Sequence, residues 1–405
     1  MKNRLLFPII FAFIFSACSD FTGNEDAVEA SLKPGPDTTA PILNEVTAVT
    51  TPTTDTTPNY TFSSSEAGTI TYGGSCSSST KKAKSGNNTI TLSTITLSTL
   101  SNGTYSDCTI TVKNTLGNSA TLIISTFVVD APTYYDMDGI TFGNNTFVAV
   151  GDDGAVLTSS DNGATWDNGT SGITKQLNDI AYGDSTFVAV GDDGTNLYSS
   201  DYGATWSSGT TTEDSDYDGV ANGQNVFVAL GNTNIIRSTD NGSTWSTITT
   251  ANLRDVAFGN STFVACGADG ATYTSDNGSQ WTSYAGIKVT SNLLRGIAFG
   301  NNIFVAVGAS GTLIKSTNNG GTFSVGVSQV STTLNSITYG NDIFLAVGTK
   351  TVIASTDNTG STFGIKATGY TFEDVTFGNG VFVAVGYKII YTSTDGISWT
   401  QVYGE

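Results

Sequence analysis

The pentapeptide FVAVG at residues 147–151 decides the fold of this chain, because it recurs along the sequence. Equivalent phrases begin at Phe187, Phe227, Phe263, Phe304, Phe344 and Phe382. Successive copies are 40, 40, 36, 41, 40 and 38 residues apart. A repeat of about 40 residues has room for four short strands, which is the signature of a β-propeller blade. Seven copies therefore predict seven small sheets packed radially about one axis.

Each repeat divides into four predicted strands. The innermost strand ends in an aromatic residue and glycine, as in DIAYG at 179–183. The FVAV phrase follows, and its continuous apolar run is typical of a strand buried on both faces. The sequence GDDG at 151–154 and 191–194 predicts a tight turn into the third strand, because glycine and aspartate tolerate positive φ. The fourth strand begins at the aromatic residue that ends the next motif.

That motif reads Ser-x-Asp-x-Gly-x-Thr-Trp at Ser159 to Trp166. Its carboxylate can accept backbone N–H groups of the turn, glycine supplies the backbone angle, and the aromatic ring buries apolar area between blades. We therefore interpret the motif residues as structural, not catalytic. They are Asp161, Gly163, Trp166, Asp201, Gly203, Trp206, Asp240, Gly242, Trp245, Asp276, Gly278, Trp281, Asn318, Gly320, Phe323, Asp357, Phe363, Asp395 and Trp399.

The later copies of this motif vary. The copy from Thr274 to Trp281 has Gln280 in place of threonine, and the copy that ends at Phe323 has Asn318 in place of aspartate. The copy that ends at Phe363 is one residue longer, and the copy that ends at Trp399 is one residue shorter.

Residues 132–405 are the predicted propeller, and from about residue 134 onward they resemble the Asp-box propellers of sialidases, xyloglucanase-type glycosidases and photosystem II assembly-factor-like proteins. The short FVAVG blades are most similar to the last, non-hydrolytic group. Fold membership does not convey activity, because function depends on the site. The resemblance to sialidases would imply three arginines that clamp a carboxylate, a Tyr–Glu pair and an acid/base aspartate.

The residues do not match that sialidase pattern. Arg237, Arg254 and Arg295 are present, but no Phe-Arg-Ile-Pro segment precedes the first blade and no long loop supplies the tyrosine and glutamate. The chain has no histidine, which excludes histidine-based triads and zinc sites that need histidine. We expect no enzyme. A sialidase-like glycoside hydrolase stays the alternative, because two carboxylates of an acidic chain can meet across a bond.

A polar position begins each predicted innermost strand, five residues before the aromatic-Gly glycine. If these side chains ring one mouth of the central channel, acids of blades one, three and seven face a basic pair from blades four and five. We hypothesise that this ring contacts a protein or glycan partner; the alternative is that strand ends near solvent are simply polar. The ring residues are Asp138, Asn178, Asp218, Arg254, Arg295, Asn335 and Glu373.

One run is similar to the start of a calcium loop: Asp214, Asp216 and Asp218 alternate before Gly219. Alternate oxygens of such a loop converge on the cation. However, the twelfth position is Asn225, which cannot give a bidentate carboxylate, and the residues after Gly219 are needed as a strand. We predict no cofactor, with calcium at this run as the alternative.

Residues 1–17 predict a secretion signal, because Lys2 and Arg4 precede an apolar run that is too short to span a bilayer. The sequence FSAC at 15–18 is similar to a bacterial lipobox, with Phe15 in place of the usual leucine. That resemblance implies cleavage before Cys18, acylation of Cys18 and stable attachment to a membrane. The alternative is a plain signal peptide with an incidental cysteine. We expect a lipid-anchored envelope protein at the outer membrane or cell surface.

Residues 18–37 are polar and lack apolar periodicity, which predicts a flexible tether. Residues 38–131 contain strand-like runs such as TITY at 69–72, separated by turns rich in Ser, Thr, Asn and Gly. The run LSNGTY at 100–105, followed by TITV at 109–112, resembles the Ig-like domains of bacterial surface proteins. The expected fold class is thus all-β, an Ig-like β-sandwich followed by a seven-bladed β-propeller.

The remaining cysteines are expected to be structural. Cys76 and Cys108 lie in one predicted domain of an exported chain, which predicts a disulfide. Cys266 stands where other repeats carry Val or Leu, so we expect a small buried hydrophobe.

The charge constrains the partners. The net charge is −19, and removal of Lys2 and Arg4 with the signal leaves about −21. Nucleic acid is therefore a poor partner, and the membrane is reached only through the lipid. We expect a monomer that binds a protein or a glycan.

Overall fold

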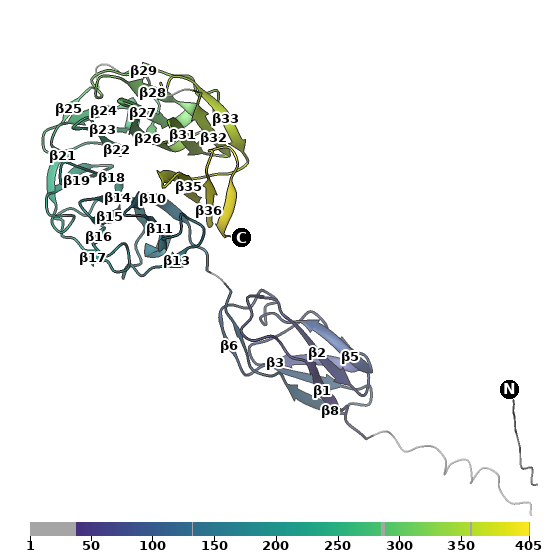
Figure 1. The fold of residues 1–405 in the computed structure, drawn as a ribbon. Coiled ribbons are helices and arrows are strands. Elements are labelled where there is room, and N and C mark those ends of the chain that lie inside the picture. The colour runs from purple at the N-terminus through teal and green to yellow at the C-terminus, as the bar shows by residue number, and fades with distance from the viewer. Residues whose placement is uncertain (1–37, 132, 285–287, 357–358, 405) are drawn as a thin grey trace, which may run out of the picture. The chain divides into compact units, whose positions relative to one another are not determined.

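The computed structural model describes residues 38–131, 133–284, 288–356 and 359–404. The chain divides between residues 132 and 133 into two compact units (Figure 1). The signal segment, Cys18 and the tether predicted for residues 1–37 lie outside the described residues, as does Asp357. Within the described part, no helix has the length and apolar character needed to cross a membrane.

The first unit is built from β-strands in three sheets. A three-stranded sheet has the order β1-β2-β5, a four-stranded sheet has the order β4-β3-β7-β8, and β6 pairs with β9. The strands are β1 (Leu43–Thr47), β2 (Asn59–Ser64), β3 (Gly68–Gly73), β4 (Lys82–Ala83), β5 (Gly86–Thr91), β6 (Gly103–Tyr105), β7 (Thr109–Lys113), β8 (Ser119–Ile123) and β9 (Phe127–Val129).

One hydrophobic core holds the first unit together. Alternate residues of β2 and β7 are buried, which is the pattern of strands with one face on a core. Tyr60 and Phe62 of β2 join Ile110 and Val112 of β7 in a single cluster. The predicted disulfide between Cys76 and Cys108 is confirmed, with Cα atoms 5.2 Å apart, and both residues belong to this cluster.

The described residues of the second unit form seven antiparallel four-stranded sheets, as the sequence predicts. The strands of blades one to three are β10 (Met137–Gly143), β11 (Thr146–Gly151), β12 (Val156–Ser159), β13 (Asp167–Asn168); β14 (Leu177–Gly183), β15 (Thr186–Gly191), β16 (Asn196–Ser199), β17 (Ser207–Ser208); β18 (Tyr217–Gly223), β19 (Val226–Gly231), β20 (Asn234–Ser238), β21 (Ser246–Thr250).

Blades four to seven repeat this order to the C-terminal end. Their strands are β22 (Leu253–Gly259), β23 (Thr262–Gly267), β24 (Thr272–Ser275), β25 (Thr282–Ser283); β26 (Leu294–Gly300), β27 (Ile303–Gly308), β28 (Leu313–Ser316), β29 (Ser324–Val325); β30 (Leu334–Gly340), β31 (Ile343–Gly348), β32 (Thr351–Ser355), β33 (Phe363–Thr368); β34 (Asp374–Gly378), β35 (Val381–Gly386), β36 (Ile389–Ser393), β37 (Thr400–Gly404). Short 3₁₀ turns lie between the second and third strands of blades one, four and five, as η3 (Asp152–Gly154), η4 (Ala268–Gly270) and η6 (Ala309–Gly311).

The FVAVG strands form the middle of each blade. Every residue of β11, β15 and β23 is buried, including Cys266, as expected for strands covered on both faces. Burial raises the pKa of the Cys266 thiol well above its usual value, so the thiol stays protonated and behaves as an apolar side chain. Each hydrophobic cluster of the propeller joins side chains of two neighbouring blades, as between Val188 of blade two and Phe227 of blade three.

The blades close into a ring, and the aromatic-Gly signature explains how. A Cβ at Gly143 would lie 2.0 Å from the ring of Tyr182 in the next blade, so only glycine admits this close approach. The same contact joins Gly378 of blade seven to Phe142 of blade one. Blade seven forms its outer strand from its own residues in β37, and Figure 1 shows the ring formed by the seven sheets. The ring therefore closes by packing, without strand exchange between the termini.

The turn motif performs the structural role predicted for it. Asp161 accepts hydrogen bonds from the backbone N–H and hydroxyl of Thr165 at 2.9 and 2.6 Å, while Gly163 N–H donates to the Ser159 hydroxyl. The Trp166 ring donates to the Gly163 carbonyl at 3.2 Å and packs against residues of blade seven. The motif thus fixes its own turn and one blade junction.

Blade four corrects one assignment. Asn277, not Asp276, accepts the turn N–H groups of Ser279 and Gln280, and Ser275 accepts from Gly278. The turn is one residue shorter than in blade one, so the acceptor moves one residue toward the tryptophan. Blade seven shows the same arrangement, in which Asp395 accepts from Ile397 and Ser398. Asp276 is therefore not a structural motif residue.

Candidate functional site

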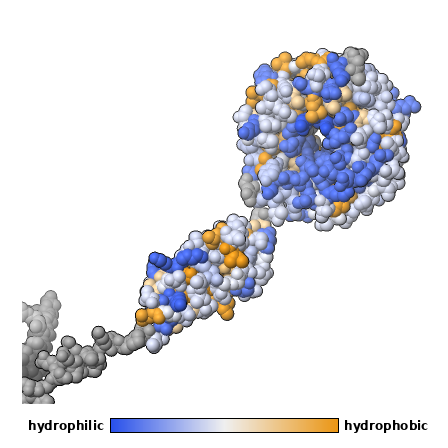
Figure 2. Space-filling model, turned by 180° about the vertical axis from the view of Figure 1, so that it is seen from behind, coloured by the Kyte–Doolittle hydropathy of each residue, from blue (hydrophilic) through white to orange (hydrophobic). Residues whose placement is uncertain are grey.

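The structure brings all seven predicted ring residues to one cavity of about 220 Å³ on the propeller axis. They lie at or next to the first residue of the innermost strands, at the end of the blades opposite the turn motifs. We call this end the channel mouth. Figure 2 shows hydrophilic side chains gathered around the open channel on one face of the propeller. The members are Asp138, Asn178, Asp218, Arg254, Arg295, Asn335 and Glu373.

Hydrogen bonds between blades hold most of this ring in place. Arg254 of blade four donates to the Asp218 carboxylate of blade three at 2.6 Å, and both side chains are partly buried. Arg254 also donates to Asn232. Arg254, one residue of the predicted basic pair, is therefore already paired within the protein. It stabilises the channel mouth and is not an unpaired charge there.

The two ring asparagines join neighbouring blades. Asn178 donates to the backbone carbonyl of Tyr217 at 3.0 Å, from blade two to blade three. Asn335 donates to the Glu373 carboxylate and to the Phe372 carbonyl, both at 3.0 Å, from blade six to blade seven. These bonds prevent rotation of the side chains and give the mouth a fixed pattern of donors and acceptors.

Arg295 differs from the other six ring residues. Among the residues that the structure describes, its side chain makes no hydrogen bond or ion pair, although it is exposed and lines the cavity. Its charge acts on Glu373, where it opposes the rise in pKa that burial of that carboxyl causes. A guanidinium carries five N–H donors in a planar fork. Arg295 thus presents unfilled donors to any molecule at the mouth.

A second tier of acids, which was not predicted from the sequence, lies just inside the ring. Asp179, Asp255 and Asp374 follow the ring position directly and also line the cavity. Asp255 accepts from Ile297 N–H of the next blade and from Val256 N–H of its own blade, both at 2.7 Å. Asp179 and Asp374 repeat this bridge to Val220 and Ile140. The tier therefore links blade two to three, four to five and seven to one.

One feature of the sequence could have revealed this tier: acid and glycine alternate between most successive blades at the position after the ring residue. The blade that receives each bridge carries glycine at the same position, as Gly219 does after Asp179. A Cβ at Gly219 would lie 2.6 Å from the Arg254 carbonyl, so the inner strands approach too closely there for any side chain.

The carboxyls of the mouth have raised pKa values. Burial raises the pKa of Asp138 to about 7, and the nearby charges of Asp152, Glu373 and Asp136 add to the rise. Burial also raises the pKa of Asp255 to about 7 and that of Asp374 to about 6, against the lowering effect of their backbone hydrogen bonds. The cause is the same throughout, because a carboxylate loses solvation in the channel.

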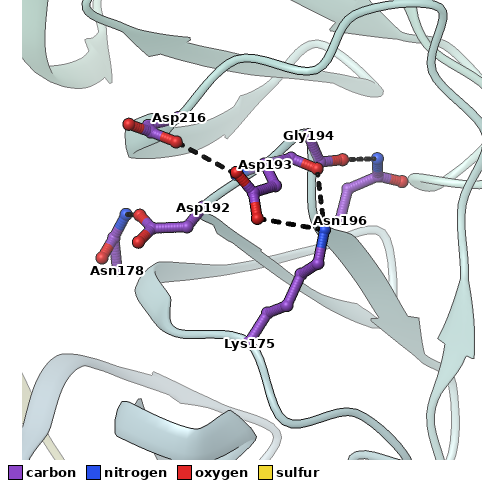
Figure 3. Close-up of polar contacts among 7 residues, drawn as sticks. All are labelled: Lys175, Asn178, Asp192, Asp193, Gly194, Asn196 and Asp216. Atoms are coloured by element: carbon purple, nitrogen blue, oxygen red, sulfur yellow. Dashed lines mark hydrogen bonds and ion pairs between the residues drawn. The ribbon is translucent and has the colours of Figure 1, made fainter.

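The turns beside the mouth add acids on the side of blades one to three. In blade two, Asp192 accepts from Asn178 at 2.9 Å, and the backbone N–H of Asp193 donates to Asp216 at 3.0 Å (Figure 3). Lys175 pairs with Asp193 at 3.3 Å. These contacts fix the acidic turn next to the ring.

The structure places the acidic run and the three arginines as follows. Asp216 accepts from Asp193 N–H and Asp218 pairs with Arg254, so the acidic run does not converge as a calcium loop does. No group of three or more metal-ligating side chains occurs in the described ranges. Arg237 donates to the Asn277 carbonyl and does not line the cavity, so three arginines do not meet there.

Comparison of the sequence finds no matching family profile and no similar curated protein. Solved structures do match. YCF48 from Cyanidioschyzon merolae is 19% identical with a TM-score of 0.52, over 64% of this chain and 95% of that protein. The GH74 xyloglucanase from Xanthomonas campestris is 13% identical with a TM-score of 0.51, over 64% of this chain and 52% of the xyloglucanase.

A third likeness is the WD40 β-propeller domain of Doa1, at 13% identity and a TM-score of 0.51, over 64% of this chain and 93% of that domain. Proteins with different names share this architecture at such low identity, so the likeness defines a fold and not an activity. Together with the seven four-stranded sheets, it identifies residues 133–404 as a β-propeller.

Proposed function

We propose that this chain is a non-enzymatic binding protein of the cell envelope, and that the channel mouth of its propeller captures a protein partner. The observation that carries the proposal is Arg295, the ring residue with no hydrogen-bond partner in the described part of the chain. An exposed guanidinium without a partner can form charge-assisted, bidentate hydrogen bonds with a carboxylate. The other six ring residues form the fixed surroundings of this donor.

The charges around the mouth favour a protein over a small molecule. Acidic turns of blades one and two carry Asp152 and Asp193, whereas the corresponding turns of blades six and seven carry the exposed Lys350 and Lys388. Opposite charges on two sides of one face orient a large partner and reject a reversed one. Rigid blades with variable turns suit such recognition.

The test is capture from envelope extracts by the immobilised full-length protein and two arginine variants. Arg295→Ala should lose the partner that the wild type retains, because it removes the free donor. Arg237→Ala is the matched control, since Arg237 lies outside the cavity, and it should capture normally. Capture should also weaken as salt is raised. Equal capture by Arg295→Ala and wild type would contradict the proposal.

Glycoside hydrolysis is the competing function, and one observation favours it. Asp138 has a pKa raised to about 7 and shares the cavity with Asp218 and Glu373. A carboxyl that keeps its proton near neutral pH can serve as a general acid. A screen with fluorogenic glycosides, sialosides included, separates the two functions. Turnover that disappears in Asp138→Asn would replace binding with catalysis.

We propose further that Cys18 is lipidated and that residues 38–131 form an Ig-like spacer between the membrane and the propeller. The lipobox-like FSAC sequence supports the anchor, and the sheets that share one core support the spacer. Metabolic labelling with palmitate tests the anchor. The wild type should be labelled and should fractionate with membranes, and Cys18→Ser should do neither; label retained by Cys18→Ser would contradict it.

A further inference from the structure

A groove lies beside the turn motif of blade four, and it is lined by residues that depart from the motif of the other blades. The groove has a volume of about 320 Å³ and shares no lining residue with the channel mouth. Asp276, Asn277, Gln280 and Tyr284 line it together with three hydroxyl-bearing residues, Thr274, Ser275 and Thr282. It lies at the opposite end of the blade, beside the turn between β24 and β25.

Because the turn of blade four is one residue shorter, Asp276 is not needed as the acceptor of the turn N–H groups. In blades one, two and three, the motif aspartates Asp161, Asp201 and Asp240 are occupied by hydrogen bonds within the turn. Asn277 has taken over this role, and Asp276 has no hydrogen bond or ion pair to any described residue. Its exposed carboxylate is therefore free to accept hydrogen bonds in the groove.

Gln280 is a second departure of blade four. The corresponding residues Thr165, Thr205 and Thr244 direct their hydroxyls to the motif aspartate. Gln280 uses only its backbone N–H in the turn, so its side-chain amide keeps two donors and an acceptor without a partner in the described ranges.

Tyr284 is the third departure. Its backbone N–H donates to the Thr272 carbonyl, as the N–H groups of Gly169, Gly209 and Gly326 do to the corresponding carbonyls of blades one, two and five. Those blades thus have glycine where blade four has a tyrosine. The tyrosine is half-buried and lines the groove. One blade has therefore gained an aromatic surface, a free carboxylate and a free amide in one place.

We propose that this groove binds a saccharide. A sugar ring has flat faces of C–H groups and a rim of hydroxyls that both donate and accept. A tyrosine gives such a face a rigid apolar contact. Carboxylate, amide and hydroxyl groups match the rim. A protein segment would bring apolar side chains, and the groove has no aliphatic residue to receive them.

The proposal is independent of the proposed function, because the two sites share no residue. Calorimetric titration of the full-length protein with cellohexaose, chitohexaose and mannohexaose tests it. At least one hexasaccharide should bind. Tyr284→Gly, which restores the residue of blades one, two and five, and Asp276→Ala should each weaken that binding about tenfold, the effect of one lost contact of about 1.4 kcal/mol.

Tyr202→Ala is the matched control, since Tyr202 is an exposed tyrosine of the blade two motif, outside the groove. It should leave saccharide binding unchanged, and so should Arg295→Ala. The melting temperature of each variant shows that the fold is kept. The absence of binding to all three hexasaccharides at millimolar concentration, or binding that survives Tyr284→Gly unchanged, would overturn the proposal. Loss of saccharide binding in Arg295→Ala would overturn the separation of the two sites.

Discussion

Asp161 in a turn motif and Asp255 in the channel are both aspartates of the repeated blades, but their surroundings differ. The side chain and backbone of Thr165 and the Ser159 hydroxyl hold the pKa of Asp161 down at about 2, and its bonds stay within seven residues of chain. Burial raises the pKa of Asp255 to about 7, and one of its bonds reaches the next blade. The turn end is thus fixed by local contacts, and the channel end by contacts between repeats.

This difference explains why the two ends have different sequences. A local turn depends only on residues of its own blade, so the same motif can be repeated from blade to blade. At the channel end, an acid such as Asp179 bridges to a blade that carries glycine at the same position, such as Gly219. A Cβ at Gly219 would be too close to the Arg254 carbonyl of the following blade. These positions therefore differ from blade to blade, and so do the neighbouring ring residues. Functional variation is expected at the channel end for this reason, and at the turn end only where a turn departs from the motif, as in blade four.

The largest loss of stability should come from removal of an aspartate that joins two blades in the channel. Asp255→Ala leaves the N–H groups of Val256 and Ile297 without an acceptor and should cost about 2–4 kcal/mol in the free energy of unfolding. Asp255→Asn keeps one acceptor oxygen and should cost less than half as much. Urea denaturation measures both. Equal losses for the two variants would mean that the bridge is not what stabilises this junction.

A smaller loss of stability is expected when a turn aspartate is removed, and Asp276 of blade four is the control residue that should not matter. Asp161→Ala should cost about 1–2 kcal/mol, because it removes the acceptor of the Thr165 backbone and hydroxyl. Asn277→Ala should behave alike, whereas Asp276→Ala should change stability by less than about 0.5 kcal/mol. The same urea experiment decides. A large loss in Asp276→Ala with none in Asn277→Ala would restore the assignment made from the sequence.

The dependence of stability on pH should combine the two classes of aspartate. The turn aspartates Asp161 and Asp395 have lowered pKa values of about 2, so their contribution is present above about pH 4 and is lost as the pH falls toward 2. Asp138, Asp255 and Asp374 have raised values, so their contribution is present below about pH 4 and is lost as the pH rises through about 6 to 7.

Unfolding free energy should therefore be highest near pH 4 and should decrease between pH 4 and 8. Asp255→Asn should flatten that decrease, because it removes one of the titrating groups, while Asp161→Asn should leave the decrease unchanged. Urea denaturation at a series of pH values checks this. Stability that rises steadily from pH 4 to 8 would contradict the origin assigned to the raised pKa values.

The blade architecture could be read from the sequence because it depends on local, repeated chemistry. The aromatic-Gly pairs, the FVAVG strands and the motif turns specify contacts that recur from blade to blade, although blade three carries Asn222 in place of the aromatic residue. The position of the ring residues followed from the same register, since each stands five residues before a glycine that packs on the next blade.

The structure differs from the sequence-based predictions where the register of a turn changes or where two repeats meet. Alignment on Trp281 selected Asp276, because a turn shortened by one residue still leaves an acid five positions before the tryptophan. The pairing of Arg254 with Asp218, and the absence of such a partner for Arg295 in the described part of the chain, depend on side-chain directions across blade junctions. Periodicity along one strand does not specify these directions.

Site-specific photo-crosslinking shows whether the partner is captured at the channel mouth. A benzophenone amino acid replaces Asn178 at the mouth in one protein and the exposed Ala164 of the blade one turn in another. We expect the envelope partner lost in Arg295→Ala to crosslink to position 178 and not to position 164. Crosslinking from position 164 with none from position 178 would contradict it.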